Sequence, residues 1–113
     1  MNSVNSFDEL KFFSEVKKRP NLLLGKPSIL SLRDFILGMQ YAFSACGFEN
    51  KFKYFNLFTQ WYYNYSTDKN GYVCWWNHIM YISGGFDDKA FYRFFEIFEN
   101  YLKEVHNLYL PEI

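Results

Sequence analysis

The two histidines have the side chains in this sequence that are most able to transfer protons or bind a metal ion. His78 and His106 have no cysteine or second histidine at the short spacings that zinc ligands use. His106 lies where the last predicted helix ends, and the helix dipole stabilises a partly charged imidazole there. His78 follows Trp75 and Trp76 and is either a proton carrier or a packed or surface histidine. We interpret both histidines as structural and predict no metal site.

Adjacent carboxyl groups at Asp87 and Asp88 could act as an acid–base pair. Because they stand where a helix is predicted to start, we interpret Asp87 as its N-cap and both as partners of the helix dipole. No phosphate-binding glycine loop and no G-x-S-x-G motif is present. We therefore predict no enzymatic activity and no cofactor. The enzyme alternative requires a pocket that brings distant groups together, such as His78 with Asp68.

Aromatic side chains offer a different chemistry, the anchoring of another protein. Tyrosine and tryptophan are the typical anchors of protein interfaces when they are half exposed. Tyr63 borders the polar stripe of its predicted helix, and Trp75 lies at the edge of an apolar arc. Both residues are candidates for partner binding, while most of the other rings are expected in the core.

The composition describes one small, aromatic-rich domain. Of the 113 residues 24% are aromatic, and twelve basic residues balance twelve acidic ones. This balance argues against direct nucleic-acid binding. Residues 57–113 hold seven Asp/Glu against four Lys/Arg, so the second half is the acidic one.

The sequence also predicts a cytoplasmic location. The first ten residues lack the basic and apolar regions of a signal peptide, and no stretch is long and apolar enough for a membrane helix. Cys46 and Cys74 fall within apolar helical patterns, so we expect both to be buried free thiols.

Residues 50–65 form the stretch around which we expect the fold to be organised. At helical spacing the polar side chains fall on one narrow stripe, and aromatic or aliphatic side chains cover most of the rest. Such a helix must be covered by other elements. We predict a compact all-α bundle of about five helices around it, as a single domain over residues 1–113 with tails at 1–5 and 107–113.

Two helices are predicted before this stretch. The first spans about residues 7–18, with a capping box formed by Ser6 and Glu9. Residues 19–27 read as a linker whose leucines pack under the domain. The second helix begins at Ser31 or at Ser28 and ends before Gly47. Its small-residue flank, formed by Gly38, Ala42 and Ala45, predicts a groove that aromatic residues of the central helix fill.

Two helices are predicted after it. Residues 72–83 favour a helix, but Asn70-Gly71 is a hairpin turn signal, so an α+β fold with a hairpin near residues 61–76 is the alternative. The last helix, from Asp87 to about residue 105, has a stapling residue at Phe86 and an ion pair between Glu99 and Lys103. The residues of its inner stripe are Phe91, Phe94, Phe95, Phe98, Leu102 and Val105. Leu108 and Leu110 of the extended tail are expected to dock on the body.

The order of these features resembles a group of small bacterial proteins. An Arg-Pro step at Arg19-Pro20 leads to Gly25, and then to Ser31, Leu32, Phe35 and Gly38. Trp61, a Gly-Tyr-x-x-Trp-Trp segment over residues 71–76, and a Phe-rich last helix with an acidic start follow. This pattern, over about residues 7–105, is similar to immunity proteins of polymorphic toxins, including those of contact-dependent growth inhibition.

The resemblance implies a non-catalytic cytoplasmic antidote that binds the C-terminal domain of one cognate toxin, often a nuclease, and covers its active site. Such sites are basic, so the inhibitor should offer carboxylates. The candidate partner-binding residues are then Asp68, Asp87, Asp88, Glu96 and Glu99, together with Tyr63 and Trp75. The alternative is a helical adaptor for another bacterial protein. No membrane contact is predicted, and the sequence does not determine the oligomeric state.

Overall fold

The computed structural model describes residues 7–66 and 74–113, and this part of the chain is all-α. Its elements are α1 (Glu9–Lys18), α2 (Pro20–Leu24), α3 (Ile29–Ala45), α4 (Lys53–Ser66), α5 (Trp75–Ile82), α6 (Asp87–Tyr101) and a π-helical segment, η2 (Leu102–His106). The predicted helical bundle is confirmed. The hairpin alternative is wrong where it can be seen, because residues 61–66 belong to α4 and Trp75 begins α5. Asn70-Gly71 lies outside the described residues.

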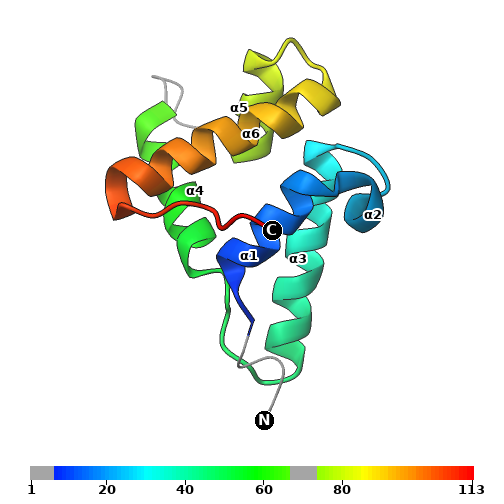
Figure 1. The fold of residues 1–113 in the computed structure, drawn as a ribbon, viewed down its shortest axis with the longest axis vertical. Coiled ribbons are helices and arrows are strands. Elements are labelled where there is room, and N and C mark those ends of the chain that lie inside the picture. Colours follow the sequence, from blue (N-terminus) through cyan, green and yellow to red (C-terminus); the bar gives the residue numbers. More distant parts are fainter. Residues whose placement is uncertain (1–6, 67–73) are drawn as a thin grey trace.

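The helices are arranged so that α1 lies between two longer helices. Figure 1 shows α5 and α6 side by side at one end of the molecule, with α3 and α4 extending away from them and α1 between. The molecule measures 47 × 29 × 28 Å. No described helix has both the length and the apolar character needed to cross a membrane.

Phenylalanine rings fill the space where α1, α4 and α6 meet. Phe13 of α1 has a ring centroid 5.8 Å from that of Phe55 and 4.8 Å from that of Phe98. Phe58 of α4 meets Phe94 and Phe98 of α6 edge to face. Such offset and perpendicular ring contacts contribute beyond the apolar area they bury. The core is therefore aromatic, as the composition predicts.

Helix α6 has the longest buried stripe, which the sequence predicts almost completely. Phe91, Phe94, Phe95, Phe98 and Leu102 are all buried. The helical spacing predicts Val105 on the same stripe, but its side chain is 50% exposed. It lies in η2, where the wider π-helical turn rotates side chains away from the α-helical spacing.

Helix α4 is covered over most of its circumference, as predicted. Phe52, Phe55, Phe58 and Tyr62 are buried, and Tyr54 and Trp61 are partly buried and pack against the core. Leu57 departs from the prediction, because it is 38% exposed. Tyr63, which was expected at the edge of the polar stripe, is 43% exposed.

The start of α1 differs from the predicted capping box. Ser6 lies outside the described residues, and Asp8 is the N-cap, accepting a hydrogen bond from the Lys11 amide at 3.1 Å. The side chain of Glu9 is directed to a different helix, α4. Its carboxylate accepts hydrogen bonds from the backbone N–H groups of Tyr54 (2.9 Å) and Phe55 (2.6 Å) at the start of α4. Glu9 is only 7% exposed, so α1 and α4 share a buried charged contact.

The predicted linker contains the short helix α2. Pro20 stands at its first position, where a missing N–H does no harm, and Gly25 ends it with φ of 84°. The three leucines do not all pack under the domain, since Leu22 is 75% exposed while Leu23 and Leu24 are partly buried.

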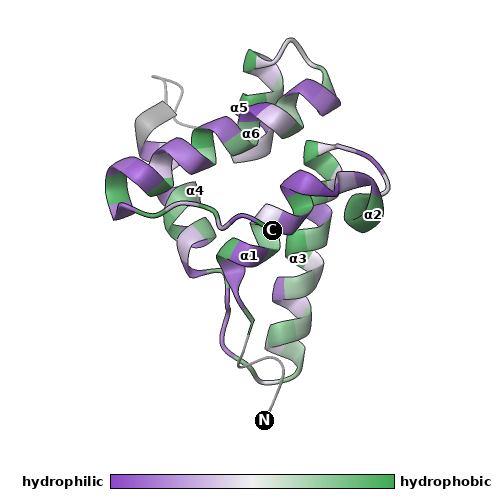
Figure 2. Ribbon diagram, viewed as in Figure 1, coloured by the Kyte–Doolittle hydropathy of each residue, from purple (hydrophilic) through white to green (hydrophobic). Residues whose placement is uncertain are grey.

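Helix α3 begins at the earlier of the two predicted N-caps, Ser28, and Gly47 follows its end with φ of 77°. In its C-terminal half, the Gln40 amide donates a hydrogen bond to Asn56 Oδ1 of α4 at 3.2 Å, and Phe43 packs against the rings of Phe7 and Phe52. A Cβ atom added to Gly38 would meet nothing within 4 Å, so the predicted filled groove is absent at this glycine. Figure 2 shows this half of α3 mostly in the colours of apolar residues. Cys46, expected to be buried, is exposed, and Cys74 is partly buried.

The segment after η2 is extended, as predicted, and crosses α1 (Figure 1). Leu108 and Leu110 pack against the core. The hydroxyl of Ser14 donates to the carbonyl oxygen of Pro111 at 2.6 Å, and the Lys18 ammonium donates to an oxygen of Ile113. Residues 107–113 are thus tied to the body.

Gly38 lies within α3 and Gly47 follows the end of this helix. Alanine substitutions at the two positions therefore test the effect of backbone conformation on stability. Gly38→Ala should raise the free energy of unfolding by about 0.5–1 kcal/mol, because an open helical site gains an alanine without a clash. Gly47→Ala should lower it by about 1–2 kcal/mol, because alanine is strained at positive φ. Both positions have empty space around the added Cβ, so a steric clash explains neither effect and the backbone conformation decides the sign of each. Urea denaturation measures both values. A destabilised Gly38→Ala variant would show that another molecule or segment occupies this space.

Glu9 should give the stability a defined pH dependence. Burial raises the pKa of its carboxyl above the ordinary value of 4.5, because lost hydration outweighs the hydrogen bonds from backbone N–H groups. The folded chain then holds this proton more tightly than the unfolded chain. The contribution of Glu9 to the free energy of unfolding is therefore largest in acid and is lost as pH rises through the raised pKa.

The measurement is urea denaturation of the wild type and of Glu9→Gln between about pH 4 and pH 8. The wild-type free energy of unfolding minus that of the variant should decline as pH rises. A difference that stays constant or grows with pH would contradict the raised pKa.

Candidate partner-binding surface

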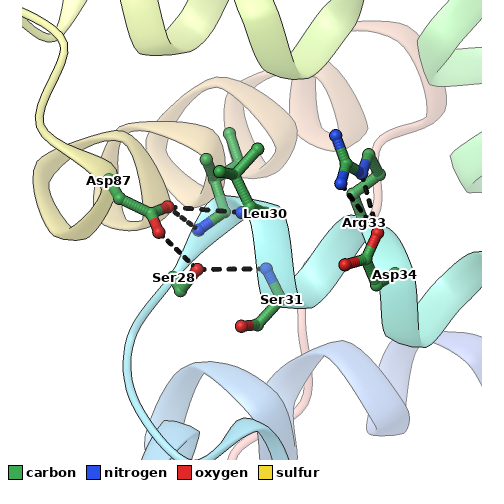
Figure 3. Close-up of polar contacts among 7 residues, drawn as sticks. Ser28, Leu30, Ser31, Arg33, Asp34 and Asp87 are labelled. Carbon is green, nitrogen blue, oxygen red and sulfur yellow. Dashed lines mark hydrogen bonds and ion pairs between the residues drawn. The ribbon is translucent and has the colours of Figure 1, made fainter.

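Asp87 does not cap its own helix. Phe86 is the N-cap of α6, is 56% exposed, and does not form the predicted staple. The Asp87 carboxylate instead accepts hydrogen bonds from the Ile29 amide at 2.7 Å, the Leu30 amide at 3.2 Å and the Ser28 hydroxyl at 2.5 Å (Figure 3). It therefore caps α3 from α6. This role removes Asp87 from the predicted partner-binding set.

Ser28 completes this junction. Its hydroxyl oxygen accepts a hydrogen bond from the Ser31 amide at 3.0 Å while its hydrogen is donated to Asp87. Ser28 is 1% exposed. One turn later Arg33 pairs with Asp34 and lies over the ring of Trp76 on α5. The start of α3 is thereby joined to both α5 and α6.

Trp75 is also structural. It is 9% exposed, and its ring centroid lies 5.2 Å from that of Phe55 and 5.3 Å from that of Phe94. The expectation of a half-exposed anchor is wrong, because α5 begins at Trp75 and this first residue faces α4 and α6.

Glu99 forms a long-range ion pair. Its carboxylate lies 2.6 Å from the Lys17 ammonium of α1, not beside Lys103 as predicted. The pair is partly exposed at the surface. Glu99 therefore links α6 to α1 and is already engaged.

Two predicted carboxylates remain available on one face of α6. Asp88 and Glu96 are exposed and eight residues apart, and Tyr92, midway between them, is 48% exposed. Residues four apart lie on the same side of a helix. We call Asp88, Tyr92 and Glu96 the α6 outer face. Helix α6 in Figure 2 is hydrophilic along much of its visible side. Tyr63 is half exposed on α4, and Asp68 lies outside the described residues.

A groove borders the α6 outer face at Glu96. It has a volume of about 660 Å³ and lies between α4, α5 and α6. We call it the three-helix groove, and the described residues that line it are Trp61, Tyr62, His78, Ile82, Arg93, Glu96, Ile97 and Asn100. The Tyr62 hydroxyl and His78 Nδ1 are 2.6 Å apart, so this hydrogen bond sets the orientation of the imidazole.

One positively charged and one negatively charged side chain, Arg93 and Glu96, are among the described residues that line the groove. Arg93 and Glu96 are exposed, and no other described residue forms a hydrogen bond or an ion pair with either side chain. By contrast, His106 lies among rings, with Nε2 2.8 Å from the Tyr101 hydroxyl and its centroid 5.1 Å from that of Tyr54. Among residues 7–66 and 74–113, no three His, Cys, Asp or Glu side chains gather as metal ligands would.

Comparison of the chain with protein families, characterised proteins and solved structures gives no match. The site therefore rests on its own geometry. Sequence reasoning missed Tyr92 and the grouping of His78 with Arg93, Glu96 and Asn100. The four-residue spacing of Asp88, Tyr92 and Glu96 is a signal that could have identified the outer face.

Alanine substitutions of the neighbouring residues Asp87 and Asp88 distinguish a structural carboxylate from a surface carboxylate. Asp87→Ala should lower the free energy of unfolding by about 2–3 kcal/mol, because backbone N–H groups at the start of α3 lose a charged acceptor. Asp88→Ala should change it by less than about 1 kcal/mol, because Asp88 is exposed and its one hydrogen bond among the described residues is from the Lys89 amide. Urea denaturation of both variants measures the two changes in the free energy of unfolding. Equal losses would contradict the assignment of Asp87 as the cap of α3.

Proposed function

We propose that this protein is an immunity protein, which binds the C-terminal domain of a cognate bacterial toxin and neutralises it. The proposal rests on the α6 outer face, where a half-exposed tyrosine lies between two available carboxylates beside a groove. The resemblance in the order of sequence features supports the same proposal.

Each part of the face has a role in such binding. Tyr92 is a large amphipathic side chain of the kind that dominates interface energies. Asp88 and Glu96 attract a basic surface during approach and so increase the association rate. A nuclease domain presents such a surface, because it must hold phosphates. Toxin domains of this class are therefore the proposed partners.

The helix that carries the face is held firmly. Phe91, Phe94, Phe95 and Phe98 are buried on its inner side, and Asp87 joins its first turn to α3. The Lys17–Glu99 pair joins its last turns to α1. A face that needs no ordering on association loses less conformational entropy when a partner binds.

The proposal is tested by co-expression with a toxin domain. The probe is the C-terminal domain of a large secreted toxin encoded beside the gene for this chain, expressed with and without the protein. Growth restored by the protein, together with a stable complex in solution, is the expected result. Failure to restore growth overturns the toxin assignment, and purification with a partner that is not a toxin favours the adaptor alternative.

The location of the interface has its own test. Asp88→Lys with Glu96→Lys should slow association with the toxin domain at low salt by about tenfold or more, because attraction becomes repulsion. The matched control is Glu49→Lys with Glu112→Lys, which changes the net charge equally at exposed sites outside the α6 outer face and the three-helix groove. Stopped-flow fluorescence measures both rates. Equal slowing of the two variants would place the interface elsewhere.

A further inference from the structure

The three-helix groove places charges of opposite sign three residues apart on α6. Arg93 and Glu96 both line it, and neither side chain pairs with another described residue. We propose that the groove binds an extended peptide segment that carries one acidic and one basic side chain two residues apart. This inference rests on the proposed function, because it specifies the part of the toxin domain that the groove takes.

The spacing of the charges fits an extended chain. Three residues of an α-helix rise about 4.5 Å. Side chains two residues apart in an extended chain point to the same side and are about 7 Å apart. The length and freedom of the arginine and glutamate side chains cover this difference. A peptide running along α6 therefore places its acid against Arg93 and its base against Glu96.

The remaining lining suits a peptide. Trp61, Ile82 and Ile97 supply apolar surface for the neighbouring side chains of the segment and reduce the access of water to the ion pairs. The Asn100 amide carries both a donor and an acceptor, which is the complement of a peptide group. His78, oriented by Tyr62, adds a second polar group across the groove.

Ligands with charges of one sign fit less well. A nucleic-acid backbone would bring phosphates against Glu96, and a purely basic segment would bring like charge against Arg93. Like charges held this close to each other repel, so both contacts would be unfavourable. The charge pattern of the groove thus selects a segment that contains both signs.

The test uses short peptides as probes and nuclear magnetic resonance of the full chain. Acetyl-Leu-Asp-Leu-Lys-Leu-amide, its order-reversed form with Lys before Asp, and an uncharged form with Asn and Gln are titrated into labelled protein. The Trp61 indole and Asn100 amide signals should shift saturably with one charged peptide. That peptide should bind about fivefold or more tightly than the other two. Equal binding of all three, or none, overturns the proposal.

A charge exchange within the groove sharpens the test. In the variant Arg93→Glu with Glu96→Arg, the preference between the two charged peptides should invert. The control Lys103→Glu with Glu104→Lys exchanges exposed charges outside the groove and should keep the wild-type preference. An unchanged preference in the groove variant overturns the proposed contacts.

Protection of cells from the toxin, measured for the wild type and for the groove variant, distinguishes failure of this inference from failure of the proposed function. If the wild type protects cells and the groove variant protects them equally, the groove is not the contact, although the immunity function stands. If the wild type protects against no toxin domain while peptide selectivity and its inversion are observed, the groove inference stands and the immunity function fails.

Discussion

The architecture depends on two carboxylates that each cap a helix other than their own. Glu9 of α1 accepts hydrogen bonds from backbone N–H groups at the start of α4, and Asp87 of α6 does the same for α3. The first turn of a helix leaves N–H groups without internal partners and carries partial positive charge. A carboxylate from a neighbouring helix accepts hydrogen bonds from these N–H groups and compensates the partial positive charge. It also fixes where the two helices meet. The bundle is therefore joined at helix ends as well as along helix faces.

These junctions matter because the core itself is permissive. Ring contacts such as those of Phe13 with Phe55 and Phe98 span several tilted and perpendicular geometries. Apolar burial is non-directional and tolerates small shifts of one helix against another. Hydrogen bonds to a carboxylate tolerate far less change in distance and angle. The rings thus supply most of the favourable burial, and Glu9 and Asp87 restrict which arrangement of helices uses it.

The same constraint shapes the surface. Because Asp87 and Glu99 hold α6 to α3 and α1, the acidic residues of α6 that remain for a proposed partner are Asp88 and Glu96. They stand on a helix whose opposite side is buried in the core, so the face is presented in a fixed orientation. The groove beside it arises where α4, α5 and α6 diverge, and its charged side chains are left without described partners. The structural role and the proposed recognition role are therefore divided along a single helix.

The sequence by itself determined the five longer helices and most of the inner stripe of α6, because 3.6-residue spacing and turn residues such as Gly47 act locally. It also identified Asp88 and Glu96 as surface carboxylates. Only the tertiary structure decided that Asp87 caps α3, that Trp75 is buried and that Gly38 faces open space. The physical reason is that a carboxylate near several N–H groups, or a ring at the edge of an apolar arc, has local alternatives of similar energy. Packing chooses between them by deciding which helix end comes within reach.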